Sequence, residues 1–303
     1  MTAFSFIGRV FIALFLLGIF GCAHLSSSDP HGLNRIGIFE DGTLYRTPGK
    51  GGAGQFNVLV LKGSWREMGR QYGYLLKDPM KEFYETAVTQ YLVRKKGITY
   101  AEVKEASEEI YAQQFPYMRE LIAGMTETSG FSLEKQKIVS ALVHLMDLSP
   151  GCSSMAAWGT YTGGGALVLG RNWDIGGPYR EYRKYLSVVI YCPVDSSNAV
   201  ADINFLGTLS LQTGMTRNGI FLDLQNGQRS DPKEVASRRM PTFDHFDFLI
   251  NTSTIEDLNA RMLDPANLPA LSLIINVADA KEDRVYEWAT YAVRRRTGNG
   301  LIA

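Results

Sequence analysis

The sequence of 303 residues predicts an α+β fold, with a mainly helical first half and a strand-rich second half. Between residues 65 and 145, apolar residues recur at steps of three and four, as they do on one face of a helix. After residue 151 they form short runs separated by glycine-rich or polar turns, which is typical of strands. Helices followed by such strands favour layered antiparallel sheets that are covered by helices.

The composition excludes some classes of function. The 31 Lys and Arg residues balance the 31 Asp and Glu residues, so the charge favours no nucleic-acid partner. The 3 cysteines are too few for a disulfide framework, and none of the 4 histidines has the spacing of zinc ligands. We therefore expect no metal ion and no other cofactor.

The N-terminus carries a targeting signal. Arg9 precedes the apolar run 10–20, which is short for a membrane span but suits the core of a signal peptide. The run leads to Gly21-Cys22, as in a bacterial lipoprotein cleavage box. We therefore expect a signal peptide at 1–21 and a lipid on Cys22, which anchors the protein in the bacterial cell envelope, facing the periplasm or the exterior. An ordinary secretory signal or an uncleaved anchor would also place the protein outside the cytoplasm.

Residues 22–54 predict a lipid-anchored tether, because they are rich in glycine and polar residues and show no sustained period. The glycines near its end precede the apolar strand 56–61, whereas a phosphate-binding loop follows a strand.

Three helical segments come next. Residues 65–91 predict the first, and residues 100–126 predict a second, which Pro116 kinks or splits. Ser132 caps the third. His144 lies on or beside the apolar face of that helix, where a histidine is more often a core residue than a catalyst.

The second half predicts strands and one pair of helices. The helices are 243–250 and 254–263, and Ser253 and Glu256 predict a capping box at the start of the second. The predicted strands are 155–161, 166–172, 185–194, 199–205, 209–216, 220–224, 271–277 and 285–295.

The stretch from Gly151 to Asp174 organises the chain. It opens with Gly151-Cys152, turns at the glycines 163–165, and ends in a short run that contains Arg171 and Asp174. Antiparallel pairing across this turn would bring a thiol, a cation and a carboxylate together at one edge. On spacing alone, a surface ion pair after a strand is the favoured interpretation of Arg171 and Asp174.

Cys152 needs a proton acceptor, because the thiolate is the nucleophile and a free cysteine has a pKa of about 8.5. Nothing in the sequence marks one of the histidines as its partner. If the bond between Gly151 and Cys152 is cut, the freed α-amino group, with a pKa of about 7.7 to 8.0, can act as the base. Gly151 suits such a cut, because glycine can adopt strained backbone angles that expose its carbonyl.

Four motifs resemble those of the cysteine N-terminal-nucleophile (Ntn) hydrolases. The most similar branch is that of acyl-coenzyme A:6-aminopenicillanic acid acyltransferase, with choloylglycine hydrolase and penicillin V acylase as relatives. The motifs are GSWREMGRQYG at 63–73, GCSS at 151–154, GRNWD at 170–174 and GMTRNGI at 214–220.

The resemblance implies a four-layer αββα sandwich made as a precursor. Residues 55–151 would be a mainly helical pro-segment, and residues 152–303 the catalytic region. That region would be incomplete, because the family continues through further strands and a second asparagine near the site.

The family's roles carry over by position. Cys152 would be the nucleophile, and its freed amino group the base. Arg171 would lie near the thiolate and help to place the substrate, and Asp174 would orient the amino group. Asn226 would donate to the oxyanion, although an asparagine in this setting is equally consistent with a turn residue.

We therefore expect a hydrolase of linear amides, or an acyltransferase, that acts on a small acyl-amide through an S-acyl enzyme. Hydrolysis is favoured over transfer, because acyl-coenzyme A is not expected outside the cytoplasm. One alternative is a lipid-anchored binding or scaffold protein that keeps the fold without turnover. Another is a cysteine hydrolase that uses His144 as its base and stays uncut.

Overall fold

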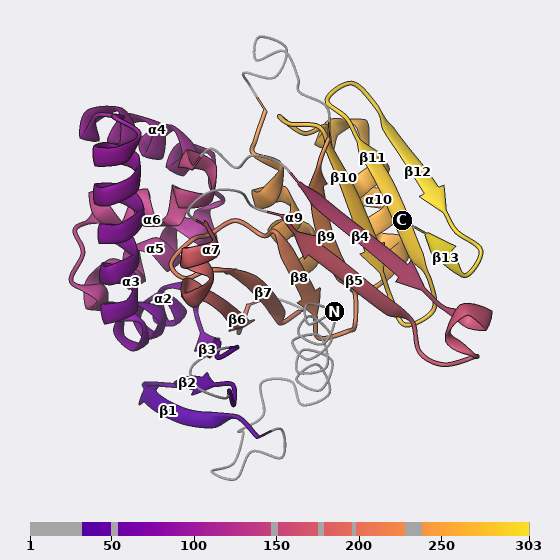
Figure 1. Cartoon of the computed structure of the whole chain (residues 1–303), viewed down its shortest axis with the longest axis horizontal. Coiled ribbons are helices and arrows are strands. Elements are labelled where there is room, and N and C mark those ends of the chain that lie inside the picture. The colour runs from indigo at the N-terminus through magenta and orange to yellow at the C-terminus, as the bar shows by residue number, and fades with distance from the viewer. Residues whose placement is uncertain are drawn as a thin grey trace.

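The computed structural model describes residues 32–49, 54–146, 151–174, 179–195, 198–227 and 238–302. Its organisation is α+β, as the sequence predicts (Figure 1). The main sheet is built from ten short strands. They are β1 (Asn34–Phe39), β2 (Gly42–Arg46), β3 (Asn57–Gly63), β6 (Leu186–Pro193), β7 (Val200–Phe205), β8 (Thr213–Thr216), β9 (Phe221–Asn226), β10 (Leu273–Ala278), β11 (Asp283–Trp288) and β12 (Val293–Thr297).

These strands lie side by side in the order given, and neighbouring strands are antiparallel except for the parallel pair β3 and β6. Successive side chains of a strand point to opposite faces of the sheet. In β3, Leu59 and Leu61 belong to the main core beneath the helices, whereas Val58 and Val60 belong to a cluster on the opposite face. The sheet is therefore buried on both faces at this strand.

The helices of the first half gather at one end of the molecule (Figure 1). They are α2 (Trp65–Leu75), α3 (Lys77–Tyr84), α4 (Tyr100–Gln113), α5 (Pro116–Ser129) and α6 (Leu133–Leu145). Pro116 is the first residue of α5, so the predicted split at this proline is confirmed. Ser132 caps α6, as predicted. A Cβ on Gly124 would lie 2.0 Å from the backbone oxygen of Arg66, so only glycine allows α5 to cross α2 this closely.

A small second sheet lies over one end of the large one. It consists of β13 (Leu301–Ile302), β4 (Cys152–Ala157) and β5 (Val168–Trp173), in that order. Ala156, Val285 and Ile302 pack together, which joins the small sheet to β11. In Figure 1, β4 and β5 cross in front of β9 to β11, while α10 (Ile255–Leu263) lies behind them. Sheet, sheet and helix thus form three successive layers here, and the fourth layer of the expected sandwich stays a prediction.

The predicted tether is wrong for residues 34–46, which form the β1–β2 hairpin at the edge of the large sheet. The two strands have 6 and 5 residues, too few for a sustained period, and β2 is stabilised by pairing with β3. Glu40 takes a φ of 51° in the two-residue turn. The predicted signal peptide, Cys22 and the remaining parts of the tether up to residue 31 lie outside the described residues. No helix of the described ranges is long and apolar enough to cross a bilayer.

The predicted helix 65–91 is interrupted. It breaks at Leu76, resumes as α3, and continues from Glu85 to Lys95 as a π-helix. Periodicity alone could not show this, because the buried residues of the π-helix still recur at separations of three and four: Ala87, Val88, Tyr91 and Leu92.

Two predictions near the C-terminal half are also corrected. The predicted strand 285–295 is the hairpin of β11 and β12, which turns at residues 289–292. The capping box of α10 is made by Thr254 and Asp257, one residue later than predicted. Glu256 is engaged elsewhere, because its carboxylate accepts two hydrogen bonds from Arg284.

Candidate active site

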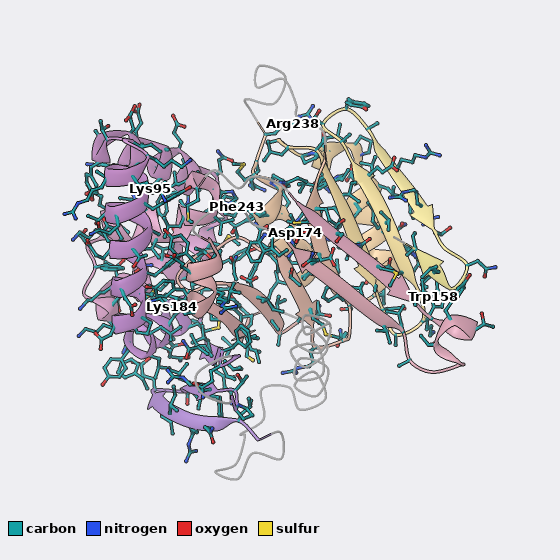
Figure 2. All side chains as sticks on the ribbon, viewed as in Figure 1. Lys95, Trp158, Asp174, Lys184, Arg238 and Phe243 are labelled. Carbon is teal, nitrogen blue, oxygen red and sulfur yellow. The ribbon has the colours of Figure 1, made fainter. Side chains whose placement is uncertain are left out.

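The hairpin of β4 and β5 brings the two ends of the 151–174 stretch together. Cys152 pairs with Trp173 and Ser154 pairs with Arg171 in the antiparallel register. Gly163 and Gly164 take φ values of 64° and 78° in the connecting turn, which favours glycine. Figure 2 shows Asp174 at the inner end of this hairpin, beside the helices, and Trp158 near its outer end. The prediction that the thiol and the charged residues meet at one edge is confirmed.

Arg171 is buried beside the thiol. Its Nη2 atom lies 3.8 Å from Cys152 Sγ and donates to the backbone oxygen of Leu224 at 2.7 Å. Its Nη1 atom donates to Thr213 Oγ1. The side chain is only 7% exposed, so the alternative of a surface ion pair with Asp174 is wrong. Contacts to β8 and β9 of the large sheet therefore hold the guanidinium against the thiol.

Cys152 is a free cysteine, and it is partly buried. Burial raises the pKa of this thiol, because the thiolate loses hydration. The positive charge of Arg171 and the backbone N–H of Asp174 act in the opposite direction and lower the pKa. Burial is the larger effect, so the thiol of the uncut chain is mostly protonated at neutral pH.

Gly151 lies directly against Asp174. The backbone N–H of Asp174 donates to the carbonyl oxygen of Gly151 at 2.6 Å. A Cβ on Gly151 would be 3.0 Å from Asp174 Cβ, a contact that requires one of the two residues to move. Gly151 does not take a positive φ, so the expected strained backbone is not seen. The close approach of Asp174 favours glycine here instead.

The carboxylate of Asp174 has a defined direction. Asn172 Nδ2 donates to Asp174 Oδ1 at 2.6 Å. Asn172 follows Arg171 on β5 and Asp174 comes directly after the end of that strand, so one short segment carries the cation, the carboxylate and the amide that orients it.

Within the described residues, two other candidates form no hydrogen bond with Cys152, Arg171 or Asp174. Asn226 is the last residue of β9, two residues beyond the carbonyl of Leu224 that Arg171 contacts, and its side chain is exposed. His144, on α6, is 3.2 Å from Thr242 Oγ1 through its Nε2 atom. Burial lowers the pKa of His144 to about 4, so this ring is neutral at physiological pH.

Sequence reasoning missed a polar cluster under the hairpin, made by Ser154, Asp223, Gln225 and Asn276. Its one signal in the sequence is the charged Asp223 within the apolar strand Phe221–Asn226. Among the described residues, no group of three or more His, Cys, Asp or Glu side chains has an arrangement that could hold a metal ion.

Comparisons with known proteins leave the family open. No protein-family model matches the chain, and no curated protein matches it. Among solved structures, the chain is similar to a variant of conjugated bile acid hydrolase from Clostridium perfringens, with 18% identity and a TM-score of 0.35. That similarity covers 50% of this chain and 53% of the hydrolase, so the chain spans about half of that protein's length.

Two further structures are similar in part. One is a Caenorhabditis elegans orthologue of N-acylethanolamine-hydrolyzing acid amidase, with 17% identity and a TM-score of 0.39 over 50% of this chain and 68% of the amidase. The other is penicillin V acylase from Agrobacterium tumefaciens, with 16% identity and a TM-score of 0.29 over 36% of each chain. Similarity this partial does not establish a family for the chain.

Proposed function

We propose that this protein is a cysteine Ntn hydrolase that cuts its own chain between Gly151 and Cys152 and then hydrolyses an amide bond of a small acyl-amide. The observation that carries this proposal is the buried contact of 3.8 Å between Arg171 Nη2 and Cys152 Sγ, next to the Gly151 carbonyl. A cation, a thiol and a polarised peptide bond at one position are the parts that such a self-cleavage needs.

The cleavage follows from the contacts of the Gly151 carbonyl. The thiol of Cys152 loses its proton and attacks the carbonyl carbon of Gly151, and the peptide C–N bond breaks. The departing nitrogen takes up that proton, so a thioester and a free α-amine form. The backbone N–H of Asp174, already 2.6 Å from the carbonyl oxygen, stabilises the oxyanion of the tetrahedral intermediate. Water then hydrolyses the thioester, which leaves a carboxylate on Gly151 and a free thiol on Cys152.

The same groups support turnover. The freed α-amine of Cys152 accepts the thiol proton, and Asp174 orients it, since its carboxylate is held in place by Asn172. The thiolate attacks the substrate carbonyl, and the leaving amine takes the proton from the α-ammonium group. Water resolves the S-acyl enzyme. Asn226, at the end of β9, is proposed as an oxyanion donor to the substrate.

The wider assignment belongs to the same proposal. Residues 55–151 are the pro-segment that cleavage separates from the catalytic region, and a lipid on Cys22 anchors the protein at the bacterial envelope. Hydrolysis is favoured over acyl transfer for a protein outside the cytoplasm.

One observation favours the alternative of a lipid-anchored scaffold without turnover. Burial raises the pKa of the Cys152 thiol, and a protonated thiol does not attack. Turnover escapes this limit once cleavage has created the α-amine that takes the proton, whereas the cleavage itself depends on the thiolate fraction that Arg171 stabilises.

The mass of the purified full chain tests the proposal. The enzyme predicts two fragments that part between Gly151 and Cys152, and Cys152→Ala predicts one uncut chain with no amide hydrolysis. The matched control Ser153→Ala alters an exposed neighbour of the nucleophile and is expected to process normally. If wild type stays whole, or if Cys152→Ala is cut like wild type, the proposed function is wrong. An uncut wild type whose hydrolysis is lost in a His144→Ala variant would support a His144-dependent hydrolase instead.

A further inference from the structure

A buried hydrogen-bonded cluster fastens the strand of Cys152 to the large sheet. Ser154, two residues after Cys152 on β4, accepts hydrogen bonds from the side-chain amides of Gln225 at 2.8 Å and of Asn276. The same two amides donate to Asp223 Oδ1, at 2.5 Å and 3.0 Å. A single carboxylate on β9 thereby orients both amides that hold the nucleophile's strand.

Arg171 is positioned around the same carboxylate. Its Nη1 atom donates to Thr213, which pairs directly with Asp223 across β8 and β9. Its Nη2 atom donates to the backbone oxygen of Leu224, the residue after Asp223. The guanidinium is therefore held near Asp223 while it also contacts Cys152.

Asp223 and Arg171 each have one polar side-chain atom, an acceptor and a donor, that forms no hydrogen bond within the described residues. Asp223 Oδ2 and Arg171 Nε are both buried, and neither has a hydrogen-bond partner within the described residues. No ion pair joins the two side chains in the part of the chain that the structure describes, so they interact through space. Charges interact more strongly in such a buried site than in water.

The strands packed around Asp223 contribute both neutral and charged side chains to its surroundings. Ser154 on β4, Asn276 on β10 and Thr213 on β8 are neutral, and Arg171 on β5 is the neighbouring cation. Asp283 on β11 is the neighbouring acid and is 1% exposed. Burial and, to a smaller extent, the charge of Asp223 raise the pKa of Asp283 to about 7. Burial raises the pKa of Asp223 to about 6, against the opposing effect of Arg171.

We propose that Asp223 is a positioning residue whose negative charge offsets that of Arg171 and thereby sets the reactivity of the Cys152 thiol. An ionised Asp223 weakens the stabilisation that Arg171 gives to the thiolate, and a protonated Asp223 restores it. Asp223 also accepts hydrogen bonds from the side-chain amides of Gln225 and Asn276. These two amides hold Ser154, and with it the strand of Cys152.

The inference rests on the proposed function only for its meaning in catalysis, since thiol reactivity is measurable without turnover or cleavage. The probe is iodoacetamide, applied to the purified full chain from pH 5 to pH 10, with alkylation read at the Cys152 peptide by mass spectrometry. Asp223→Asn keeps the volume and one acceptor oxygen but removes the charge. Its alkylation at pH 7.5 is expected to be about three to ten times faster than that of wild type, since loss of a nearby negative charge lowers a thiol pKa.

The matched control is Asp283→Asn, which removes a similarly buried acid on β11, two strands along the sheet from Asp223. It leaves Asp223 more readily ionised, so alkylation is expected to be unchanged or slower. Faster alkylation in both variants would show general loosening around the thiol and overturn the proposal, as would an unchanged rate in Asp223→Asn.

The dependence of Cys152 alkylation on pH in the wild-type protein tests the proposal even if neither variant folds. A titrating Asp223 predicts a second inflection near pH 6, besides that of the thiol itself, and a profile with one ionisation overturns the proposal. A chain that stays uncut and inactive would refute the proposed function and leave this measurement valid.

Discussion

The contact between Arg171 and Cys152 allows a quantitative test. Replacing Arg171 by Gln removes a positive charge whose Nη2 atom lies 3.8 Å from the sulfur. At 3.8 Å, Coulomb's law gives about 4 kcal/mol for an effective dielectric constant of about 20, and about 1 kcal/mol in bulk water. These limits correspond to about 3 and about 0.8 pKa units. Because Cys152 is only partly buried, we expect the thiol pKa to rise by about 1 to 2 units.

The assay is again alkylation of Cys152 by iodoacetamide as a function of pH. Below the thiol pKa the rate follows the fraction of thiolate, so Arg171→Gln is expected to react about ten to one hundred times more slowly at pH 7.5. Self-cleavage of the variant is expected to slow in parallel, because the same thiolate attacks Gly151.

The control is Arg295→Gln on β12, where an exposed guanidinium donates to Asn259 at 2.8 Å. This variant removes the same charge far along the sheet and is expected to leave the thiol profile as in wild type. A thiol pKa in Arg171→Gln within about 0.3 units of wild type would refute the electrostatic reasoning, provided that thermal unfolding shows an intact fold.

Two further predictions test the fold. Gly124→Ala places a Cβ 2.0 Å from the backbone oxygen of Arg66, so α2 and α5 must separate, and we expect a loss of about 2 kcal/mol or more in urea unfolding. Gly170→Ala has open space around its Cβ and is expected to change stability by less than about 0.5 kcal/mol, so equal losses would contradict the packing argument. His245 is fully buried and its pKa is lowered to about 3, so the unfolded state binds its proton first as the pH falls. Its contribution to stability is complete above pH 6.5 and is lost from there down to about pH 3, by about 1.4 kcal/mol per pH unit. In His245→Phe that part of the slope of the unfolding free energy against pH should be missing, and an unchanged slope would show that this ring does not titrate differently on unfolding.

Local patterns predicted much of the secondary structure, because they depend on neighbouring residues. Pro116 starts a helix since its ring fits the first helical turn, and Ser132 caps one because its oxygen reaches a free backbone N–H. The cap of α10 was misplaced by one residue, since Ser253 and Thr254 are both good caps and the choice depends on Arg284, which engages Glu256 from β11. The β1–β2 hairpin was missed for the same kind of reason, because its pairing partner β3 lies outside it in sequence.

Within the candidate site, the sequence determined the hairpin that joins Cys152 to Arg171 and Asp174. Strand pairing across a glycine turn is a short-range event, and it places residues at equal distances from the turn opposite one another. What only the tertiary structure decided is the environment of that hairpin. The small sheet packs on β8 to β10, and this contact turns Arg171 from an exposed cation into a buried one and surrounds it with Thr213, Leu224 and Asp223. Burial and charge at the thiol are sums over segments that are distant in sequence, so no local pattern contains them.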